Sequence, residues 1–440
     1  MLIDFTVKNY TSFKEDKLFS FLCTSNNVKK DVALSSLYDD KIKTYPVSVV
    51  LGPNASGKTN LIHALYDFRN LVKKSNQFVK DQDILIYNPF ILNSITKNAP
   101  TKFDIEFAYE NNHFQYLIEF NRNAILKEEL YLYKNNEKLT KSFLYKRKMD
   151  EIVFGTKYVG EKAIFKRLLL PNKLLLSLIG ESSNESVIQS AYKFFISGLD
   201  IIYPQREEYA ISNKYYTEYS IKNNPKFKTL VIALLKSADI QISDIIIDYD
   251  EKLEKKLHND NPEINKILIN DIATKTYFAH PLFDEKNNNI GKELLNFKNS
   301  ESSGTKKLYE ISTSIIYSLL MGNTLIIDEL SSCLHPNVES FIVKLFSSNE
   351  ININGAQLLF NTHNVNSIDK EDEFMKEQIW FTDRNKYGES DLFSLDEFDS
   401  NKIRNYAKYG KTYFDNRVGA LPDICFNIFK EELYKYYGKE

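Results

Sequence analysis

Short apolar runs separated by polar turns fill the first third of the chain, and this pattern predicts β-strands. The opening segment, 2–10, alternates apolar and polar positions as a half-buried strand does, and 17–23 could pair with it. Three further runs, at 103–109, 114–121 and 125–133, are divided by short polar turns. We expect these three to form an antiparallel meander.

The segment 47–51 differs, because it is almost entirely apolar and stands directly before a glycine-containing loop. Such a run is typical of a buried strand, and the apolar positions of 60–66 predict a helix after the loop. The loop matches the P-loop pattern G-x-x-x-x-G-K-[ST] in full, with Gly52, Pro53, Asn54, Ala55, Ser56, Gly57, Lys58 and Thr59.

The residue types of this loop explain how it would hold a nucleotide. Gly52 and Gly57 let backbone N–H groups curve around a phosphate, and the helix that opens at Gly57 adds its positive end. Lys58 supplies charge to the β- and γ-phosphates, and the Thr59 hydroxyl binds the accompanying Mg²⁺. Asn60 follows at the start of the helix and belongs to the expected site. We therefore predict that the chain binds a nucleotide together with Mg²⁺.

From about residue 155 the pattern changes to helical spacing with long charged side chains, as in 162–168 and 227–235. The charged segment 245–262 could form a helix hairpin, but no heptad repeat persists long enough for a coiled coil. A strand-like run at 273–283 follows. The middle of the chain is therefore expected to be mainly helical.

A second group of motifs stands in the last third of the chain. The apolar run 323–327 predicts a strand that delivers Asp328 and Glu329 at its carboxyl end, where open α/β sheets bind ligands. In this Walker B pattern Asp328 would hold Mg²⁺, and Glu329 would orient or deprotonate the attacking water. A strand ending in two acids is common by itself, but the P-loop in the same chain favours the catalytic interpretation.

Two weaker patterns flank this strand. Upstream, Ser302, Ser303 and Gly304 precede an amphipathic helix expected at 308–320. A Ser-x-Gly at a helix N-terminus can bind an anion, although a plain helix cap has the same spelling. Downstream, another predicted strand leads to His363, which could contact the γ-phosphate or the attacking water. A lone histidine there is more often structural, and the order of the motifs favours function.

Composition narrows the class of protein. The chain has 57 basic and 59 acidic residues, a net charge of −2, so it has no bulk attraction to nucleic acid or anionic membranes. Cys23, Cys333 and Cys425 have the spacing of neither a disulfide framework nor a zinc site. The first residues lack signal-peptide features, and no apolar run approaches the roughly 20 residues that span a bilayer. We expect a cytoplasmic protein without membrane contacts.

In their order, these motifs resemble those of the ABC-type ATPases of the SMC, RecF and OLD-like group. Within that group the chain is most similar to the RloA/AbiL-like ATPases of bacterial abortive-infection systems. The likeness rests on 5–13, the P-loop, Ser302-Ser303-Gly304-Thr305 as the signature, Asp328-Glu329, the D-loop 331–336, Asn361-Thr362-His363 with its switch histidine, and Gly419-Ala420-Leu421-Pro422. It covers both lobes and leaves the segment from about 150 to 290 unassigned.

The resemblance implies an α/β ABC-type ATPase head, with a mixed P-loop sheet, an antiparallel β lobe and a mainly helical insertion. The expected parts are an N-terminal ATPase lobe at 1–150, the insertion at 151–290 and a C-terminal ATPase lobe at 291–440. Ser303 stands where the family signature usually has glycine, so the contact with γ-phosphate is inferred for Ser302 and Gly304 only. No motif identifies the Q-loop glutamine, although Gln77 and Gln82 lie in the plausible region.

One chain carries one P-loop and one signature, so the resemblance implies a homodimer or higher homo-oligomer whose heads sandwich ATP. OLD-like relatives continue into a Toprim nuclease, whereas only about 75 residues follow His363 here. The acids in that stretch are typical of a solvated loop, namely Asp369, Glu371, Asp372 and Glu373. We therefore expect a sensor or regulatory subunit of an anti-phage system, triggered by a phage component. It would control a separate effector encoded nearby, expected to be a Toprim-type or other nuclease.

A DNA-repair or chromosome-maintenance ATPase of the RecF or SMC type, which clamps DNA, is the alternative. Nucleic acid would then bind a stripe of basic residues: Lys146, Arg147, Lys148, Lys162, Lys166 and Arg167. Solvated helix faces would have the same composition, and the near-neutral net charge favours that interpretation. A nuclease within the insertion has no H-N-H or P-D-x-D/E-x-K pattern to support it. The sequence leaves the effector, the trigger and the stoichiometry open.

Overall fold

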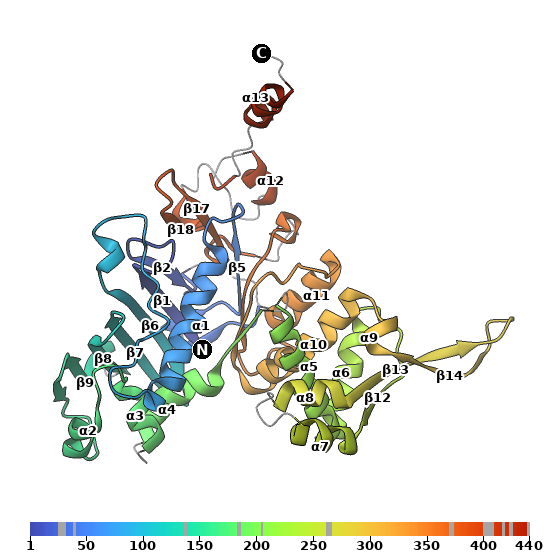
Figure 1. Cartoon of the computed structure of the whole chain (residues 1–440), viewed down its shortest axis with the longest axis horizontal. Helices are drawn as coiled ribbons and strands as arrows, with labels where there is room; N and C mark the ends of the chain where they lie inside the picture. The colour runs from blue at the N-terminus through green and yellow to red at the C-terminus, as the bar shows by residue number, and fades with distance from the viewer. Residues whose placement is uncertain are drawn as a thin grey trace.

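The computed structural model describes residues 1–24, 32–37, 41–135, 139–182, 186–203, 206–260, 266–368, 374–398, 409–415, 419–421 and 426–437. Figure 1 shows an antiparallel sheet on the left, a sheet that carries the P-loop in the centre, and a mainly helical region on the right. The expected α/β architecture, with a P-loop sheet and a separate antiparallel β lobe, is confirmed.

The P-loop sheet runs in the order β11-β15-β16-β5-β17-β18. Its strands are parallel, except that β18 is antiparallel to β17. Their bounds are β11 (Leu199–Ile202), β15 (Thr324–Ile327), β16 (Gln357–Asn361), β5 (Val47–Leu51), β17 (Ile379–Arg384) and β18 (Ser390–Ser394). Every residue of β5 is buried, as in a strand covered on both faces. The predicted strands at 47–51 and 323–327 are confirmed, and β16 confirms the strand that leads to His363.

The antiparallel sheet runs in the order β10-β9-β8-β7-β6-β1-β2. Its bounds are β10 (Glu151–Phe154), β9 (Leu139–Lys148), β8 (Ile125–Asn135), β7 (Asn112–Phe120), β6 (Thr101–Tyr109), β1 (Leu2–Lys8) and β2 (Lys17–Ser20). The predicted pairing of the first two strands and the predicted meander are both confirmed. The meander continues into β9 and β10, which were not predicted, and β9 contains three lysines and an arginine.

Helix α1 (Lys58–Lys74), which follows the P-loop, packs against both sheets. The Phe68 ring lies 6.4 Å from that of Phe5 and 5.3 Å from that of Phe103, both on the antiparallel sheet. The same hydrophobic cluster includes Val50 and Leu359 of the P-loop sheet. A core shared by the two sheets therefore fixes the position of the P-loop helix.

A buried glutamine joins the two sheets where β16 and β1 begin. The side-chain oxygen of Gln357 accepts hydrogen bonds from the Leu2 backbone N–H at 2.6 Å and from the Thr324 hydroxyl at 2.9 Å. Its amide nitrogen donates to the Leu2 carbonyl at 2.9 Å. Residues from the beginning and from the last quarter of the sequence thus meet in one hydrogen-bonded group.

The right-hand part of Figure 1 is built around α10 (Ser303–Met321), which packs against α5 (Glu207–Asn223) and α6 (Pro225–Ser237).

The other described helices of the chain are distributed over all its parts. They are α2 (Lys162–Leu168), α3 (Leu175–Ser182), α4 (Ser186–Lys193), α7 (Glu251–Asp260), α8 (Lys266–Ala273), α9 (Phe297–Ser300), α11 (Pro336–Ser347), α12 (Tyr409–Phe414) and α13 (Phe426–Tyr436), with a π-helical turn at Phe194–Gly198. Helices were predicted within α1, α2, α6 and α10, and all four are confirmed.

The remaining strands form two small sheets. They are β3 (Ser35–Leu37) with β4 (Ile42–Thr44), and β12 (Asp244–Tyr249) with β13 (Thr274–Phe283) and β14 (Asn289–Asn296). The predicted helix hairpin at 245–262 is wrong at its start, because β12 contains three consecutive isoleucines, which favour a strand. The range 151–290, expected to be an insertion, also supplies β11 to the P-loop sheet.

Short helical turns complete the description, at Ser75–Gln77, Thr96–Asn98, Val365–Ile368, Lys376–Gln378 and Leu395–Glu397. Within the described ranges, no helix combines the length and the apolar character that crossing a bilayer requires. The acids Asp369, Glu371, Asp372 and Glu373, as well as Pro422 and Cys425, lie outside the described residues.

Arg147 does not belong to a surface stripe, which corrects one part of the DNA-binding alternative. Its side chain is buried, and it donates from Nε to the Met149 carbonyl at 2.7 Å and from Nη2 to the Pro171 carbonyl at 3.2 Å. Its Nη1 lies 3.5 Å from the buried carboxylate of Glu128. In contrast, Lys148 is exposed. A guanidinium held in this way cannot reach a DNA backbone.

Glu128 is the centre of a network that ties the antiparallel sheet to α3. It accepts hydrogen bonds from the Tyr116 and Tyr145 hydroxyls, each at 2.9 Å. It also accepts from the backbone N–H groups of Leu175 and Leu176, at 2.8 and 2.9 Å, in the first turn of α3. A carboxylate is favourable there because the free N–H groups of a helix N-terminus carry partial positive charge.

We predict that Arg147→Met destabilises the fold by about 3–5 kcal/mol, because it leaves the buried Glu128 charge without its cation. Urea unfolding monitored by circular dichroism measures the change. Lys148→Met, at the exposed neighbouring position, is the matched control and should stay within about 0.5 kcal/mol of the parent. A cost below about 1 kcal/mol for Arg147→Met would show that the pair is not needed for the fold.

Candidate ATP site

The P-loop backbone has the conformation that a phosphate cradle needs. Gly52 and Gly57 have φ values of 146° and 120°, and Ala55 between them has φ of 62°. A Cβ atom on Gly52 would lie 2.3 Å from the Thr382 carbonyl oxygen, and one on Gly57 would lie 2.6 Å from the Ser390 hydroxyl. Both the left-handed backbone and the close approach of the neighbouring strands therefore require glycine here.

The Lys58 side chain curls back over the loop. Its ammonium donates to the carbonyl oxygens of Gly52 and Pro53, both at 2.8 Å. Burial lowers the pKa of Lys58 to about 8, although the nearby Glu329 and Asp328 carboxylates act in the opposite direction. A cation that has lost water and is surrounded by backbone carbonyls is ready to pair with a phosphate.

The Asp328 carboxylate, which is fully buried, connects the two predicted halves of the site. Its Oδ1 accepts from the Thr59 hydroxyl at 3.0 Å and from the Asn361 amide at 2.6 Å. The Asn361 side-chain oxygen in turn accepts from the Glu329 backbone N–H. The ends of β15 and β16 and the first turn of α1 are thus joined by one group of side chains.

Glu329 and His363 face the P-loop from these strand ends. Both line a hollow of about 300 Å³ together with residues Asn54 to Asn60. Glu329 has a left-handed backbone with φ of 54°, which turns the chain sharply after β15. Burial lowers the pKa of His363, and the Lys58 ammonium adds to this effect, so its imidazole is neutral at pH 7. A neutral histidine can accept a proton or a hydrogen bond.

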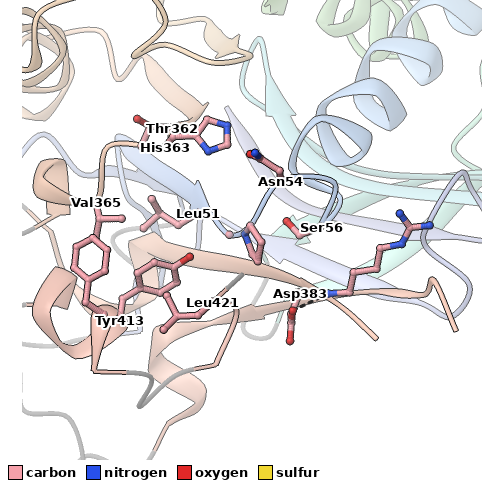
Figure 2. Close-up of a pocket in the computed structure, with 13 residues that line it drawn as sticks. Leu51, Asn54, Ser56, Thr362, His363, Val365, Asp383, Tyr413 and Leu421 are labelled. Atoms are coloured by element: carbon pink, nitrogen blue, oxygen red, sulfur yellow. Dashed lines mark hydrogen bonds between the residues drawn. The ribbon is translucent and has the colours of Figure 1, made fainter. Parts of the chain in front are cut away.

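A larger hollow of about 810 Å³ continues past the other side of the P-loop (Figure 2). The two hollows share Asn54, Ser56, His363 and Arg384, so they are adjoining parts of one depression. Figure 2 shows that Val365, Tyr413 and Leu421 give this side an apolar wall, away from the polar end at Asn54 and His363. The depression therefore has a phosphate-binding end and an apolar end, which is the layout that a nucleotide requires.

The described residues fit Mg²⁺-ATP. A positive-φ loop of backbone N–H groups and a desolvated ammonium suit the phosphates, and a hydroxyl beside a buried carboxylate suits Mg²⁺. We expect Lys58 and residues Gly52 to Asn60 to hold the phosphates, and Thr59 with Asp328 to hold the metal. Bound Mg²⁺ would neutralise phosphate charge, while Glu329 or His363 would accept hydrogen bonds from water near the γ-phosphate.

The signature residues stand apart from this depression. Among the residues described as lining either hollow, Ser302, Ser303 and Gly304 are absent. Ser302 is the N-cap of α10 and accepts from the Thr305 N–H at 3.1 Å, while Ser303 is exposed. The helix-cap interpretation thus holds for Ser302 in this chain, and its contact with a nucleotide remains a prediction.

The two candidate Q-loop glutamines also stand apart. Gln77 follows the C-terminal end of α1, and a helix of that length separates it from the P-loop by roughly 25 Å. Gln82 accepts a hydrogen bond from the Val79 N–H at 3.0 Å and so completes a local turn. Neither lines the depression, so the Q-loop position stays unassigned among the described residues.

Several contacts at the site could not be foreseen from the sequence. Ser56 and Thr382 share a hydrogen bond of 2.5 Å between their hydroxyl oxygens, and Asn60 donates to the Ser12 hydroxyl at 2.7 Å. Lys307 is buried and donates to the Glu329 carbonyl at 2.9 Å. Thr382, Ser12 and Lys307 come from distant parts of the sequence, so local spacing could not connect them with the P-loop. Asn361 belongs to the predicted motif Asn361-Thr362-His363, and its position at a strand end also indicated it.

The P-loop, the acidic pair on a parallel strand and the antiparallel β lobe together define an ABC-type P-loop ATPase. The chain belongs to the family described as "AAA domain, putative AbiEii toxin, Type IV TA system", which matches residues 47–369. No curated protein matches the sequence. The closer likeness to RloA/AbiL-like proteins stays a prediction.

Among solved structures, the chain is similar to SMC head domains. The head from Thermotoga maritima is 11% identical with a TM-score of 0.41, over 89% of this chain and 98% of that one. An Smc head bound to the C-winged helix domain of ScpA is 11% identical with a TM-score of 0.37, over 89% of this chain and 97% of that one. A third structure is an Smc head with an extended coiled coil, bound to the C-terminal domain of ScpA derived from Pyrococcus furiosus. It is 11% identical with a TM-score of 0.37, over 94% of this chain and 99% of that one. At these TM-scores the likenesses carry no further argument.

We predict that ATP affinity falls as the pH rises above about 8, because Lys58 must be protonated to pair with phosphate. Phosphate binding raises the pKa of Lys58. The affinity for ATP is therefore greatest at a pH below the Lys58 pKa of the free protein, and it falls as the pH rises toward the higher Lys58 pKa of the complex. The loss should approach about tenfold per pH unit, the limit for one proton. Titration with a fluorescent, non-hydrolysable ATP analogue between about pH 7.5 and about pH 9.5 measures it.

Lys58→Arg is the control, because a guanidinium stays charged across this range. Lys307, whose pKa burial also lowers to about 8, titrates in both proteins and therefore cancels in the comparison. If the affinity for the ATP analogue falls with pH equally steeply in Lys58→Arg and in the parent, the pH dependence belongs to another group.

Proposed function

We propose that the chain is a Mg²⁺-dependent ATPase whose site is completed by a second copy of itself. One observation carries this proposal: the P-loop, Asp328, Glu329 and His363 meet at one depression, whereas the signature at Ser302 to Gly304 does not line it. Ser303 is exposed, which leaves it free to meet the P-loop of a partner. Two copies arranged head to tail would form two complete sites.

Lys307 supports a link between the signature and the catalytic acid. It lies in the first turns of α10, a few residues after Ser303, and its ammonium donates to the backbone carbonyls of Glu329 and Ser332. A partner that pushes on the start of α10 would therefore act directly on the loop that carries Glu329. Binding of ATP would favour the closed pair, and hydrolysis would release it.

We further infer that this ATP-driven switch serves antiviral defence and controls a separate effector, which we expect to be a nuclease. The family description, which names a type IV toxin–antitoxin system, supports a role of this kind.

A DNA clamp of the RecF or SMC type is the second candidate. The exposed Lys162, Lys166 and Arg167 on α2 favour it, because they are free to contact phosphate. The burial of Arg147 removes one member of the expected stripe, and the net charge of −2 gives no general attraction. The defence switch is therefore the function that we prefer.

We predict that Glu329→Gln, which keeps the ATP contacts and loses the catalytic carboxylate, forms a stable dimer in ATP and Mg²⁺. Adding Lys58→Ala or Ser303→Glu to it should prevent the dimer, the first by loss of ATP and the second by placing negative charge against the partner's phosphate. Size-exclusion chromatography with light scattering measures the mass. Ser36→Glu, at an exposed serine that lines neither hollow of the site, is the matched control.

Mixing Lys58→Ala with Ser303→Glu provides a second measurement of the same assembly. Each variant alone should be inactive, while mixed dimers contain one site with an intact P-loop and an intact signature. Activity should return to about a quarter of the parent value if the sites act independently, since half of the dimers are mixed. No mass change in Glu329→Gln, combined with no recovery on mixing, would contradict ATP-bridged heads.

The role in defence is tested by co-purification. We expect Glu329→Gln to retain the product of the neighbouring gene in ATP, and nuclease activity to reside in that product. Lys58→Ala should fail to retain it, because it cannot form the ATP-bound state. If no partner is retained and the chain alone binds duplex DNA with a steep salt dependence, the DNA clamp replaces the defence switch.

A further inference from the structure

A second hollow, of about 570 Å³, lies away from the P-loop. One wall is the C-terminal half of α1, the opposite wall is formed by α5 and α10, and β11 lies at its base. None of its lining residues also lines the depression at the P-loop. Its volume lies within the range of roughly 300–1,000 Å³ that is usual for small-molecule sites.

The wall on α1 carries two neighbouring cations. Arg69 and Lys73 stand four residues apart, so they share one face of the helix, where like charges repel. Within the described ranges, neither forms an ion pair with a carboxylate; Arg69 donates from Nε to the Phe195 carbonyl at 3.1 Å. Burial and the Arg69 charge both lower the pKa of Lys73, while Asp200 on β11 partly offsets them. A bound anion would relieve this repulsion.

The opposite wall is aromatic. Tyr216 and Tyr219 on α5 are 53% and 58% exposed, and Tyr317 on α10 is 42% exposed. The Tyr317 ring is held by stacking on Phe227, with 4.9 Å between ring centres. Three partly exposed tyrosines around one hollow provide flat apolar faces on which a heteroaromatic ring can stack.

The wall formed by α5 and α10 also carries two polar groups that face desolvation. The Asn213 amide nitrogen is buried and has no hydrogen-bond partner in the described structure. Leaving such a donor unpaired is unfavourable, and a ligand that accepts a hydrogen bond from it would remove that cost. Burial raises the pKa of Glu310, on the facing helix, to about 7, so its carboxyl can donate as well as accept near neutral pH. An amide and a carboxyl are the groups that pair with the edge of a nucleobase.

We propose that this hollow binds a nucleotide, with its base against Tyr216, Tyr219 and Tyr317 and its phosphate on Arg69 and Lys73. This site is separate from the P-loop and takes a second nucleotide. Its position suits a regulator, because the N-terminal ends of α1 and α10 carry the P-loop and the signature. A ligand held between these helices changes how the two ends are placed; this last step rests on the proposed ATPase switch, and the binding site itself does not.

The test uses the full chain with Lys58→Ala, so that the P-loop contributes no nucleotide binding. Isothermal titration with AMP, GMP, CMP and UMP should show saturable binding of at least one. For that nucleotide, the nucleoside alone and ribose 5-phosphate alone should each bind at least about tenfold more weakly, since each loses one half of the site. Tyr216→Ala and Lys73→Ala should each raise the Kd at least about fivefold, the lower limit for one stacked base.

Lys74→Ala is the matched control, because Lys74 is the exposed neighbour of Lys73 on α1 and does not line the hollow. It should leave the Kd unchanged. Tyr216, Lys73 and Lys74 all reach the surface, so the folded state should survive each change, as circular dichroism would show. No binding of any monophosphate at millimolar concentration, or binding that both Tyr216→Ala and Lys73→Ala leave intact, overturns the proposal.

The regulatory step is measured separately in the protein with an intact P-loop. The nucleotide that binds should change the rate of ATP hydrolysis, and Tyr216→Ala should remove that change while leaving the basal rate. An inactive parent protein would count against the proposed ATPase and not against the binding site. Binding without any effect on the rate would overturn regulation from this site.

Discussion

The buried Asp328 carboxylate is the contact on which the arrangement of the site depends. Thr59 reaches it from the start of α1, and Asn361 reaches it from the end of β16. Because β15 and β16 are adjacent and parallel, their carboxyl ends bring Asp328 and Asn361 together without any special loop. Hydrogen bonds from Thr59 and Asn361 compensate the burial of this carboxylate, which is also placed where a metal would need it.

Helix α1, which follows the P-loop, and helix α10, which begins at the predicted signature, are fixed in different ways. Helix α1 lies in a core shared by both sheets, so its N-terminal end has little freedom. Helix α10 packs on α5 and α6, in the part of the molecule that the small sheet of β12, β13 and β14 completes. Lys307 is the direct polar connection from α10 to the loop after β15. The beginning of α10 is therefore connected to the loop that carries Glu329 by the Lys307 side chain, in addition to the packing of the elements around it.

The sequence predicted the parts of the fold that local patterns describe. Apolar runs gave β5 and β15, and glycine spacing gave the P-loop, because these features are set by residues adjacent in the chain. Strand β9 was missed since its lysines conceal the alternation, and β12 was assigned to a helix since acids surround its isoleucines. The contacts of Thr382 and Ser390 with the P-loop glycines could not be foreseen, because they join residues far apart in sequence. The same holds for the hollow between α1 and α5.

The order of strands around the P-loop has a consequence for synthesis. Strand β5 has β16 and β17 as its neighbours, and both emerge from the ribosome long after it. At the usual rate of about 5–20 residues per second, the P-loop strand waits for many seconds with its edges unpaired. The antiparallel β6, β7 and β8 meander, by contrast, pairs strands that are consecutive in the sequence and can form as they appear. The strand that precedes the P-loop therefore gains both of its neighbours only after β17, in the last quarter of the chain, has been made.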